Sequence, residues 1–165
     1  MITFQKIRWK NFLSTGDHWS EIDFLGNTTN LVVGTNGSGK STMLDALTFS
    51  LFNKPFRKIN KSQLVNATNE KDCVVEVEFT VNNKDYLVRR SIKPNKFDIE
   101  VNGTLLHKES DDRLNQKILE ENILKVNYKS FTQIVILGSS SFVPVSYTHL
   151  RAHETRGNVV CRLLL

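Results

Sequence analysis

The sequence GTNGSGKS at residues 34–41 constrains this chain more than any other segment, because it matches the pattern G-x-x-x-x-G-K-[ST] in full. Glycines in such a loop permit positive φ, so that successive backbone N–H groups can point at the same phosphate oxygens. A helix that begins at the end of the loop adds its N-terminal N–H groups and the positive end of its dipole. In this pattern the lysine, Lys40, reaches the β- and γ-phosphates, and the hydroxyl of Ser41 ligates Mg²⁺. The loop therefore predicts a site for a nucleoside triphosphate with Mg²⁺.

The segments on both sides of the loop strengthen this prediction. The sequence TTNLVV at 28–33 is typical of a short buried strand that leads directly into the loop. Apolar residues in 41–52 recur at helical spacing, at Leu44, Leu47 and Leu51, which indicates a helix packed against a sheet. A chance match to the loop pattern has odds of roughly one in a hundred in a chain like this. The alternative, a glycine-rich turn with an incidental lysine, is therefore disfavoured.

Much of the remaining sequence is typical of antiparallel strands. Apolar and polar residues alternate in segments that we expect to be strands, at 2–12, 18–24, 74–81 and 86–92. The segment 97–106 continues the pattern and contains Asn102-Gly103, a strong signal for a hairpin turn. These segments predict an antiparallel meander that packs beside the phosphate-loop strand and helix, in a chain of the α/β class.

Two shorter elements complete the expected fold. A helix is predicted over 112–125, and its candidate capping residues are Ser110, Asp111 and Asp112. Apolar side chains on one stripe of this helix would face the core, namely those of Leu114, Ile118 and Leu119. The segment 128–138 predicts a short helix or turn followed by a buried strand at 134–137.

Composition excludes several classes of protein. The chain has 165 residues, enough for one domain with its own core. Its two cysteines, Cys73 and Cys161, are too few for a disulfide framework and suit a reducing compartment. No apolar run is long enough to span a bilayer, and the N-terminus has no secretion signal, so we expect a cytoplasmic protein with no membrane partner. The net charge of +5 is modest and leaves a nucleic-acid surface and a solvated mixed surface equally open.

The C-terminal residues differ from the rest of the chain. From Val145 onward the sequence has three arginines and no lysine, and it contains two of the four histidines. The string VSYTHLRAHET…VCRLLL resembles a translated sequencing adapter. We therefore predict a domain at 1–144 and a non-native or disordered tail at 145–165. His149 and His153 have the i, i+4 spacing of a metal pair on a helix, but we assign them no role for this reason.

The groups that would cleave a bound nucleotide are missing from the expected sites. Hydrolysis in P-loop proteins uses an acidic residue at the end of a second buried strand. The strand predicted at 134–137 is followed by glycine and serines. Glu76 and Glu78 alternate with apolar residues, so we expect both to face solvent on an antiparallel strand. We therefore assign no catalytic residue in this chain, which is expected to bind the nucleotide without turning it over.

Several segments resemble one known group of ATPases. The sequences KNFLS, GTNGSGKST, LDALTFSLFNKPFR and SFTQIVILG are similar to the N-terminal lobe of the SMC-like ABC-type ATPases of double-strand-break repair, the group that includes bacterial SbcC. The similarity covers residues 1–144 and is greatest to the phage branch, the large subunits of the recombination endonucleases of T-even-like phages. The resemblance implies the N-terminal lobe of a P-loop NTPase. A long coiled coil and a C-terminal lobe with the signature motif, the acidic strand and a switch histidine would follow it.

The resemblance also implies partners and site residues. In this family ATP clamps two heads together as a homodimer, and the closure controls a nuclease subunit that acts on double-stranded DNA ends. Phosphate and Mg²⁺ roles carry over to the loop residues Gly34, Thr35, Asn36, Gly37, Ser38, Gly39, Lys40, Ser41 and Thr42. A weaker transfer places Lys10, Asn11 and Ser14 near the adenine. Cellular relatives have a metal-sensing glutamine where alignment puts Ser139, so Ser139 is a candidate Mg²⁺ ligand, whereas Gln133 is out of register.

Two basic clusters leave two interpretations open. Lys54, Arg57, Lys58 and Lys61 follow the first helix and would suit DNA phosphates or a solvated loop. Arg89, Arg90, Lys93 and Lys96 divide in the same way.

The sequence thus favours the ATP-binding half of a DNA-repair or recombination ATPase, with ATP and Mg²⁺ as cofactors. Hydrolysis would belong to the full-length protein. A complete small P-loop kinase is the first alternative, although its lid and substrate pocket have no counterpart in the expected meander. A non-enzymatic, nucleotide-dependent assembly module is the second.

Overall fold

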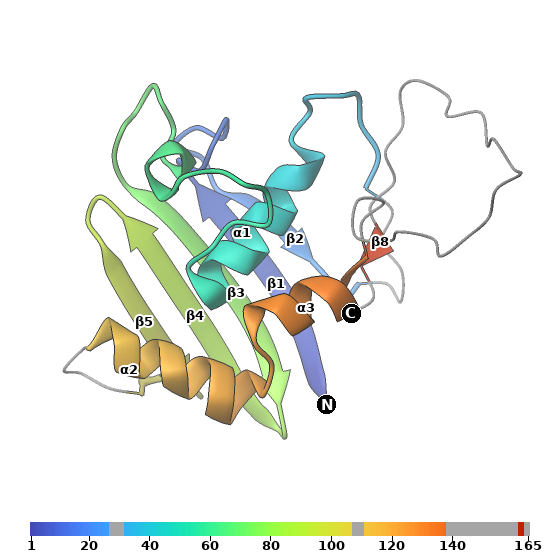
Figure 1. Ribbon diagram of the computed structural model, residues 1–165, viewed down its shortest axis with the longest axis vertical. Helices are drawn as coiled ribbons and strands as arrows, with labels where there is room; N and C mark the ends of the chain where they lie inside the picture. The colour runs from blue at the N-terminus through green and yellow to red at the C-terminus, as the bar shows by residue number, and fades with distance from the viewer. Residues whose placement is uncertain (27–31, 107–110, 138–161, 164–165) are drawn as a thin grey trace, which may run out of the picture.

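A six-stranded antiparallel sheet forms the centre of the molecule. The computed structural model describes residues 1–26, 32–106, 111–137 and 162–163. The strands run in the order β2-β1-β3-β4-β5-β6, and the helices lie over one face of the sheet (Figure 1). Their bounds are β1 Ile2–Lys10, β2 Ser20–Asp23, β3 Cys73–Val81, β4 Lys84–Ile92, β5 Lys96–Val101 and β6 Thr104–Leu105. The predicted α/β class is confirmed, with every pairing in this sheet antiparallel.

The meander β3–β6 is formed by tight hairpins with left-handed turn residues. Asn82 and Asn83 join β3 to β4 with φ of 49° and 61°, and Asn102 and Gly103 join β5 to β6 with φ of 48° and 77°. Positive φ at both central residues is the type I′ geometry, whose twist matches that of the flanking strands. Asparagine and glycine adopt this region at the least steric cost. The Asn102-Gly103 hairpin predicted from the sequence is therefore confirmed.

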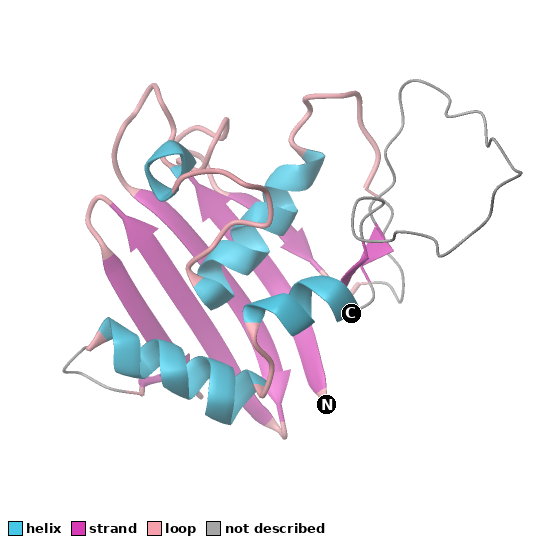
Figure 2. Ribbon diagram, viewed as in Figure 1, coloured by secondary structure: helices cyan, strands magenta, loops and turns pink. Residues whose placement is uncertain are grey.

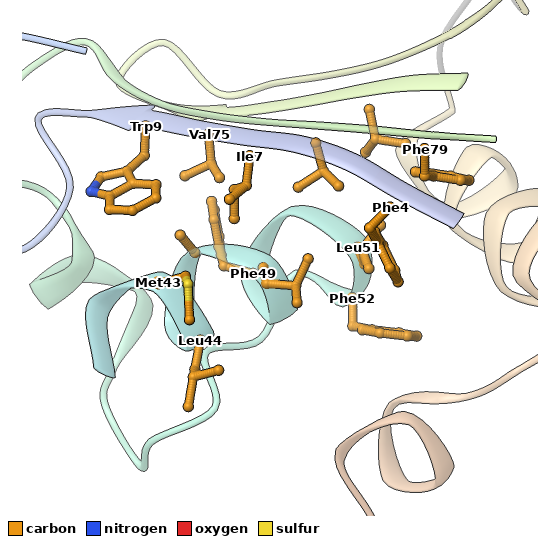
Figure 3. Packing of buried hydrophobic residues seen from close by; sticks show 14 of the residues in the cluster. Phe4, Ile7, Trp9, Met43, Leu44, Phe49, Leu51, Phe52, Val75 and Phe79 are labelled. Carbon is orange, nitrogen blue, oxygen red and sulfur yellow. The ribbon is translucent and has the colours of Figure 1, made fainter. Parts of the chain in front are cut away.

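Helix α1, Lys40–Phe52, lies across the sheet and is buried on nearly every face (Figure 2). Its Phe49 and Leu51 meet Ile7 of β1 and Val75 of β3 in a continuous apolar layer (Figure 3). The helix ends where Asn53 adopts φ of 57° and donates its N–H to the carbonyl of Phe49. The helix predicted over 41–52 is confirmed, and its core packing fixes the position of its N-terminus at the phosphate loop.

The second helical segment begins as predicted but then changes type. Asp111 caps α2, Asp112–Lys117, by accepting a hydrogen bond from the N–H of Arg113. The chain continues as a π-helix, η2, over Ile118–Leu124. Leu114 is 52% exposed, so its predicted place on the core stripe is wrong. The wider turn of the π-helix rotates the buried positions, and the core side chains here are those of Leu119, Ile123 and Leu124.

The remaining described elements are short. A 3₁₀-helix, η1, covers Lys61–Leu64, and α3 covers Tyr128–Ile134 with Asn127 as its cap. Strand β7 is Ile136–Leu137 and pairs with β8, Arg162–Leu163. The buried strand predicted at 134–137 therefore forms only at its end, because Ile134 belongs to the helix and is exposed. Residues 28–31 of the buried strand expected at 28–33 lie outside the described residues. Val32 is half-buried against the core and forms a β-bridge, whereas Val33 is 67% exposed.

Glu76 departs from its expected solvent-facing position. The prediction was wrong, because its side chain is only 3% exposed and forms ion pairs with both Arg8 and Arg89. The sheet register explains this burial, since Arg8 of β1 and Arg89 of β4 lie directly opposite Glu76 on its two sides. Alternation indicated the correct face of the sheet but not the long side chains that cover it. The hydrogen bond that Arg89 donates to Glu76 is the main cause that raises the pKa of Arg89. Glu78 is half-buried.

Arg90 lies on the opposite face of β4 and is buried in the core. Its Nε donates to the carbonyl oxygen of Ser50 at the C-terminal end of α1, and its guanidinium lies 3.6 Å from the centre of the Phe97 ring. Burial lowers the pKa of Arg90 to about 10. A cation at this end complements the helix dipole. Arg89 and Arg90 thus have structural partners on two different faces and do not form one basic surface.

None of the helices in the described ranges is both long and apolar enough to cross a bilayer.

Candidate nucleotide-binding site

The phosphate loop leads into α1 through left-handed glycines. Gly37 and Gly39 have φ of 85° and 90°, and Gly39 is the residue that precedes the first turn of α1. A Cβ on Gly34 would collide with the side chain of Ser38, which folds back over it. The backbone geometry at Gly37 and Gly39 therefore favours glycine, as the sequence pattern predicts, whereas at Gly34 the restriction comes from the packed Ser38 side chain.

Lys40 lies across the loop that it follows. Its Nζ donates to the carbonyl oxygens of Gly34 and Thr35, at 2.5 and 2.7 Å. The N–H of Ser38 donates to the same Thr35 carbonyl at 3.2 Å, which tightens the turn. This arrangement places an ammonium group beside the N-terminus of α1, so positive charge and helix N–H groups converge on one point.

A cavity of about 440 Å³ opens beside the loop. Its size is within the range that accommodates a small-molecule ligand. The predicted residues that line it are Ser14, Asn36, Gly37, Gly39, Lys40, Ser41 and Thr42. Gly34, Thr35 and Ser38 belong to the same loop but do not line the cavity. The structure therefore brings together most of the residues that the phosphate-loop pattern singled out.

The opposite wall of the cavity consists of two chain segments that are joined by hydrogen bonds. Phe12 and Val65 form an antiparallel bridge, and the N–H of Leu13 donates to the carbonyl of Leu64 at 2.7 Å. Asn66 extends this connection, since its Nδ2 donates to the carbonyl of Leu13 at 3.1 Å. The turn after β1 and the segment after η1 thus form one rigid wall that faces the phosphate loop.

Lys10 and Asn11 stand behind this wall and do not line the cavity. Asn11 is buried, adopts φ of 50°, and accepts a 2.6 Å hydrogen bond from the side chain of Asn69. Lys10 pairs with Asp17 at 3.2 Å, and its hydrogen bond is the main cause that lowers the pKa of this carboxyl. Their predicted contact with the adenine stays a prediction; in this structure both side chains organise the turn that presents Ser14.

The four residues of the first basic cluster, Lys54, Arg57, Lys58 and Lys61, have different neighbours in the structure. Arg57 lines the cavity and is bound by the buried carboxylate of Asp45. Lys54 lies over the ring of Tyr128 at 5.8 Å, and Lys61 donates to Asn95 at 3.2 Å. Lys58 is exposed. Arg57, which the sequence assigned to DNA, is placed instead beside the phosphate loop, and the DNA role of the cluster stays a prediction.

Ser41 is the residue on the loop that could ligate Mg²⁺. It lies in the first turn of α1 and lines the cavity beside Lys40. Within the described part of the chain, no three His, Cys, Asp or Glu side chains gather as a metal site. A hydroxyl with phosphate oxygens and water is a donor set that suits Mg²⁺. Ser139 lies outside the described residues.

Sequence reasoning missed the apolar part of the cavity. Leu13, Ile59, Gln63, Val65 and Ala67 line it in addition to the predicted residues. Four of these five residues lie in the segment 54–72, which is rich in polar residues and shows no regular apolar spacing. Their signal is tertiary, because they reach the site through pairing with the turn after β1 and not through any periodicity of their own.

Comparisons with known proteins agree with this geometry. A family model described as an AAA domain matches residues 6–156. Exonuclease subunit 2 of Enterobacteria phage T4 is 41% identical over 139 residues, which cover 84% of this chain and 25% of the phage protein. A DNA double-strand break repair Rad50 ATPase of Sulfolobus acidocaldarius is 29% identical over 141 residues, covering 83% of this chain and 15% of the archaeal protein. The chain therefore spans about a quarter of the length of the phage relatives it matches.

A solved structure supports the fold. It comes from work on ATP-driven dimerization and DNA stimulated activation of SMC ATPases, and it aligns with a TM-score of 0.58 over 87% of this chain and 92% of that chain. At 22% identity this match concerns the fold alone. The resemblance to SMC-like ATPases and to the phage branch, predicted from the sequence, is confirmed, and family membership implies nucleotide binding. The chain is similar to the N-terminal lobe of the SMC-like ATPases, and it belongs to the AAA domain family.

Proposed function

We propose that this chain binds ATP with Mg²⁺ and forms the phosphate-binding half of an ATPase head. The cavity between the phosphate loop and the wall at Leu13 and Val65 carries this proposal, because it combines a cationic, amide-rich end with an apolar side. A triphosphate suits the first surface and a base with its ribose suits the second.

Each loop residue has a defined part in this binding. Lys40 would exchange its bonds with the Gly34 and Thr35 carbonyls for bonds with the β- and γ-phosphate oxygens, a charge-assisted and stronger interaction. The N–H groups at the start of α1 would bind the same phosphates, and Ser41 would hold Mg²⁺ against them. Arg57 would add a second cation to the lining of the cavity. Ser139 is proposed as a further Mg²⁺ ligand on the family alignment alone.

Hydrolysis is proposed for the longer protein and not for this chain alone. Its relatives extend well beyond the matched segment, and we infer that a C-terminal lobe supplies the acidic residue and the signature motif. Two heads would then close on ATP as a homodimer. The names of the phage and archaeal relatives support a role with a nuclease subunit at double-stranded DNA ends. For a phage-encoded protein we propose the host cytoplasm as the location. The division into a domain at 1–144 and a tail at 145–165 belongs to the same proposal.

Replacing Lys40 tests the proposed binding. Lys40→Ala removes the cation that contacts the β- and γ-phosphates, so we expect the affinity for MgATP to fall about 10- to 100-fold. Titration with a fluorescent ATP analogue, competed by MgATP, measures the change. Lys84→Ala, in the exposed hairpin between β3 and β4, is the matched control and should bind as the unmodified chain does.

The rate of ATP hydrolysis distinguishes the proposed half-site from a complete small P-loop enzyme. A half-site should release phosphate from MgATP at no more than the background rate. Robust hydrolysis or phosphoryl transfer by the purified chain would contradict the half-site and favour a small kinase. Unchanged MgATP binding by Lys40→Ala would contradict the nucleotide site itself.

A further inference from the structure

Asp45 is a fully buried carboxylate within the apolar helix α1. Its side chain is 0% exposed, and the helix around it contributes Leu44, Ala46 and Leu47 to the core. Burial of a charged group is unfavourable unless ionic and hydrogen-bond partners compensate. The compensation here comes from a residue outside the helix, so Asp45 connects α1 to another part of the chain.

Arg57 is the residue that compensates Asp45. Its backbone N–H donates to Oδ1 at 2.8 Å, while its Nε and Nη2 donate to Oδ2 at 2.6 and 2.5 Å. One carboxylate thus fixes both the main chain and the guanidinium of Arg57. A guanidinium bound through Nε and one Nη2 hydrogen still presents its Nη1 hydrogens in a fixed direction.

The pair spans the distance between the helix and the cavity. Asp45 lies little more than one turn after Lys40 on α1, and the side chain of Arg57 is 46% exposed where it lines the cavity with Lys40 and Ser41. The segment before Arg57 is fixed from the other side by Tyr128, whose hydroxyl donates to the carbonyl of Pro55 at 2.8 Å. Burial is the main cause that raises the pKa of Tyr128, with the Asp45 charge adding to it.

We propose that Asp45 is a positioning residue for the nucleotide site, which holds the Arg57 guanidinium at a fixed place in the lining of the cavity beside the phosphate loop. The inference rests on the proposed MgATP site. Asp45 itself does not touch the nucleotide. Because α1 carries Lys40, Ser41 and Asp45 on one rigid element, the spacing between the loop and the Arg57 cation is set by the helix and not by the flexible arginine side chain. If Arg57 were simply part of a solvated loop, a fully buried carboxylate would not be needed to fix its guanidinium.

A double-mutant cycle tests the proposal on the full 165-residue chain. Arg57→Gln should weaken MgATP binding about 10-fold, because the cation is lost. Asp45→Asn should weaken it about 3- to 10-fold, because the amide oxygen still accepts from the backbone N–H of Arg57 but the ion pair with the guanidinium is lost. In the Arg57→Gln background, Asp45→Asn should cause no further loss, since its effect acts through Arg57. An equal loss in both backgrounds would show a general effect on α1 and overturn the proposal.

Glu76→Gln is the matched control for loss of a buried carboxylate. Glu76 also binds two arginines, but on the face of the sheet that the helices do not cover. Its variant should bind MgATP within about twofold of the unmodified chain. A comparable loss of affinity in Glu76→Gln would mean that any buried ion pair affects binding, and would overturn the specific role of Asp45.

Arg57→Lys keeps the inference testable if Asp45→Asn does not fold, as judged by circular dichroism. Lysine retains the charge but not the side-on geometry, so its affinity should lie between that of the unmodified chain and that of Arg57→Gln. Full affinity in Arg57→Lys, or in Arg57→Gln, would overturn the proposal. Lys40→Ala separates a failure of the proposed MgATP site from a failure of the positioning role. Normal MgATP binding by Lys40→Ala would contradict the site itself. Loss of binding in Lys40→Ala together with normal binding in Arg57→Gln would contradict only the positioning role.

Discussion

Gly39 joins the phosphate loop to α1 with φ of 90°, in the left-handed region that side chains with a Cβ rarely adopt. A Cβ there would meet only the Thr42 hydroxyl at an ordinary 3.6 Å, so the restriction comes from the backbone and not from space. The same φ turns the chain so that the helix N–H groups face the cavity. The identity of this residue therefore decides both local stability and the shape of the site.

We expect Gly39→Ala to cost about 1–3 kcal/mol of unfolding free energy, because alanine is strained at this φ. MgATP affinity should fall as well, since relief of the strain reorients the loop. Urea unfolding and nucleotide titration measure the two effects. Gly16→Ala is the control, because nothing lies within 4 Å of its Cβ and its φ is ordinary; equal behaviour of the two variants would contradict the argument.

At the scale of single residues, the sequence predicted what a local pattern encodes. The roles of Gly39, Lys40 and Ser41 follow from spacing alone, and the structure assembles them as expected. The prediction for Glu76 was wrong, and the ion pair of Arg57 with Asp45 was not predicted, because both depend on neighbours distant in the chain. Strand alternation does not reveal that arginines on both sides cover Glu76, and the charge of Arg57 does not reveal the buried acid that binds it.

At the scale of elements, the wall of the cavity depends on a junction between two loops. The Asn66 side chain reinforces this junction, since its Nδ2 donates to the carbonyl of Leu13, and its Oδ1 accepts from the N–H groups of Thr68 and Asn69 within its own loop. The residue is buried, so a missing partner is not replaced by bulk water.

Asn66→Ala should therefore destabilise the chain by about 1–3 kcal/mol and weaken MgATP binding, because the wall loses its side-chain link to the turn after β1 and keeps only the backbone pairing. Thermal unfolding and nucleotide titration report the two changes. Asn95→Ala removes an exposed hydrogen bond with Lys61 and should lie within about 0.5 kcal/mol of the unmodified chain. A junction without function would appear as lost stability with unaltered affinity.

Elements with strong local signals were predicted well, and those fixed by packing were not. The hairpins and α1 follow from turn residues and from apolar spacing. In α2 the buried position is Asn115 and not Leu114, and no periodic signal in the sequence marks the change to a π-helix at Ile118. The segment 54–72 gained its part in the cavity only through pairing with the turn after β1.

For the whole molecule, the buried apolar core ends at Ile136 among the described residues. A chain shortened to residues 1–144 should therefore keep its unfolding temperature within about 4 °C and its MgATP affinity, because deletion removes one two-residue strand and none of this core. Calorimetry and nucleotide titration of the shortened chain measure both. A larger drop in unfolding temperature would show that residues 145–165 belong to the folded domain.

The sheet is bounded by its two shortest strands. Strand β2 has four residues and β6 has two, and β2 carries the acidic side chains of Glu21 and Asp23. Long, flat and apolar edges recruit strands from other molecules, whereas short and charged edges resist it. We therefore expect concentrated solutions of the chain to remain free of open-ended, sheet-to-sheet aggregation.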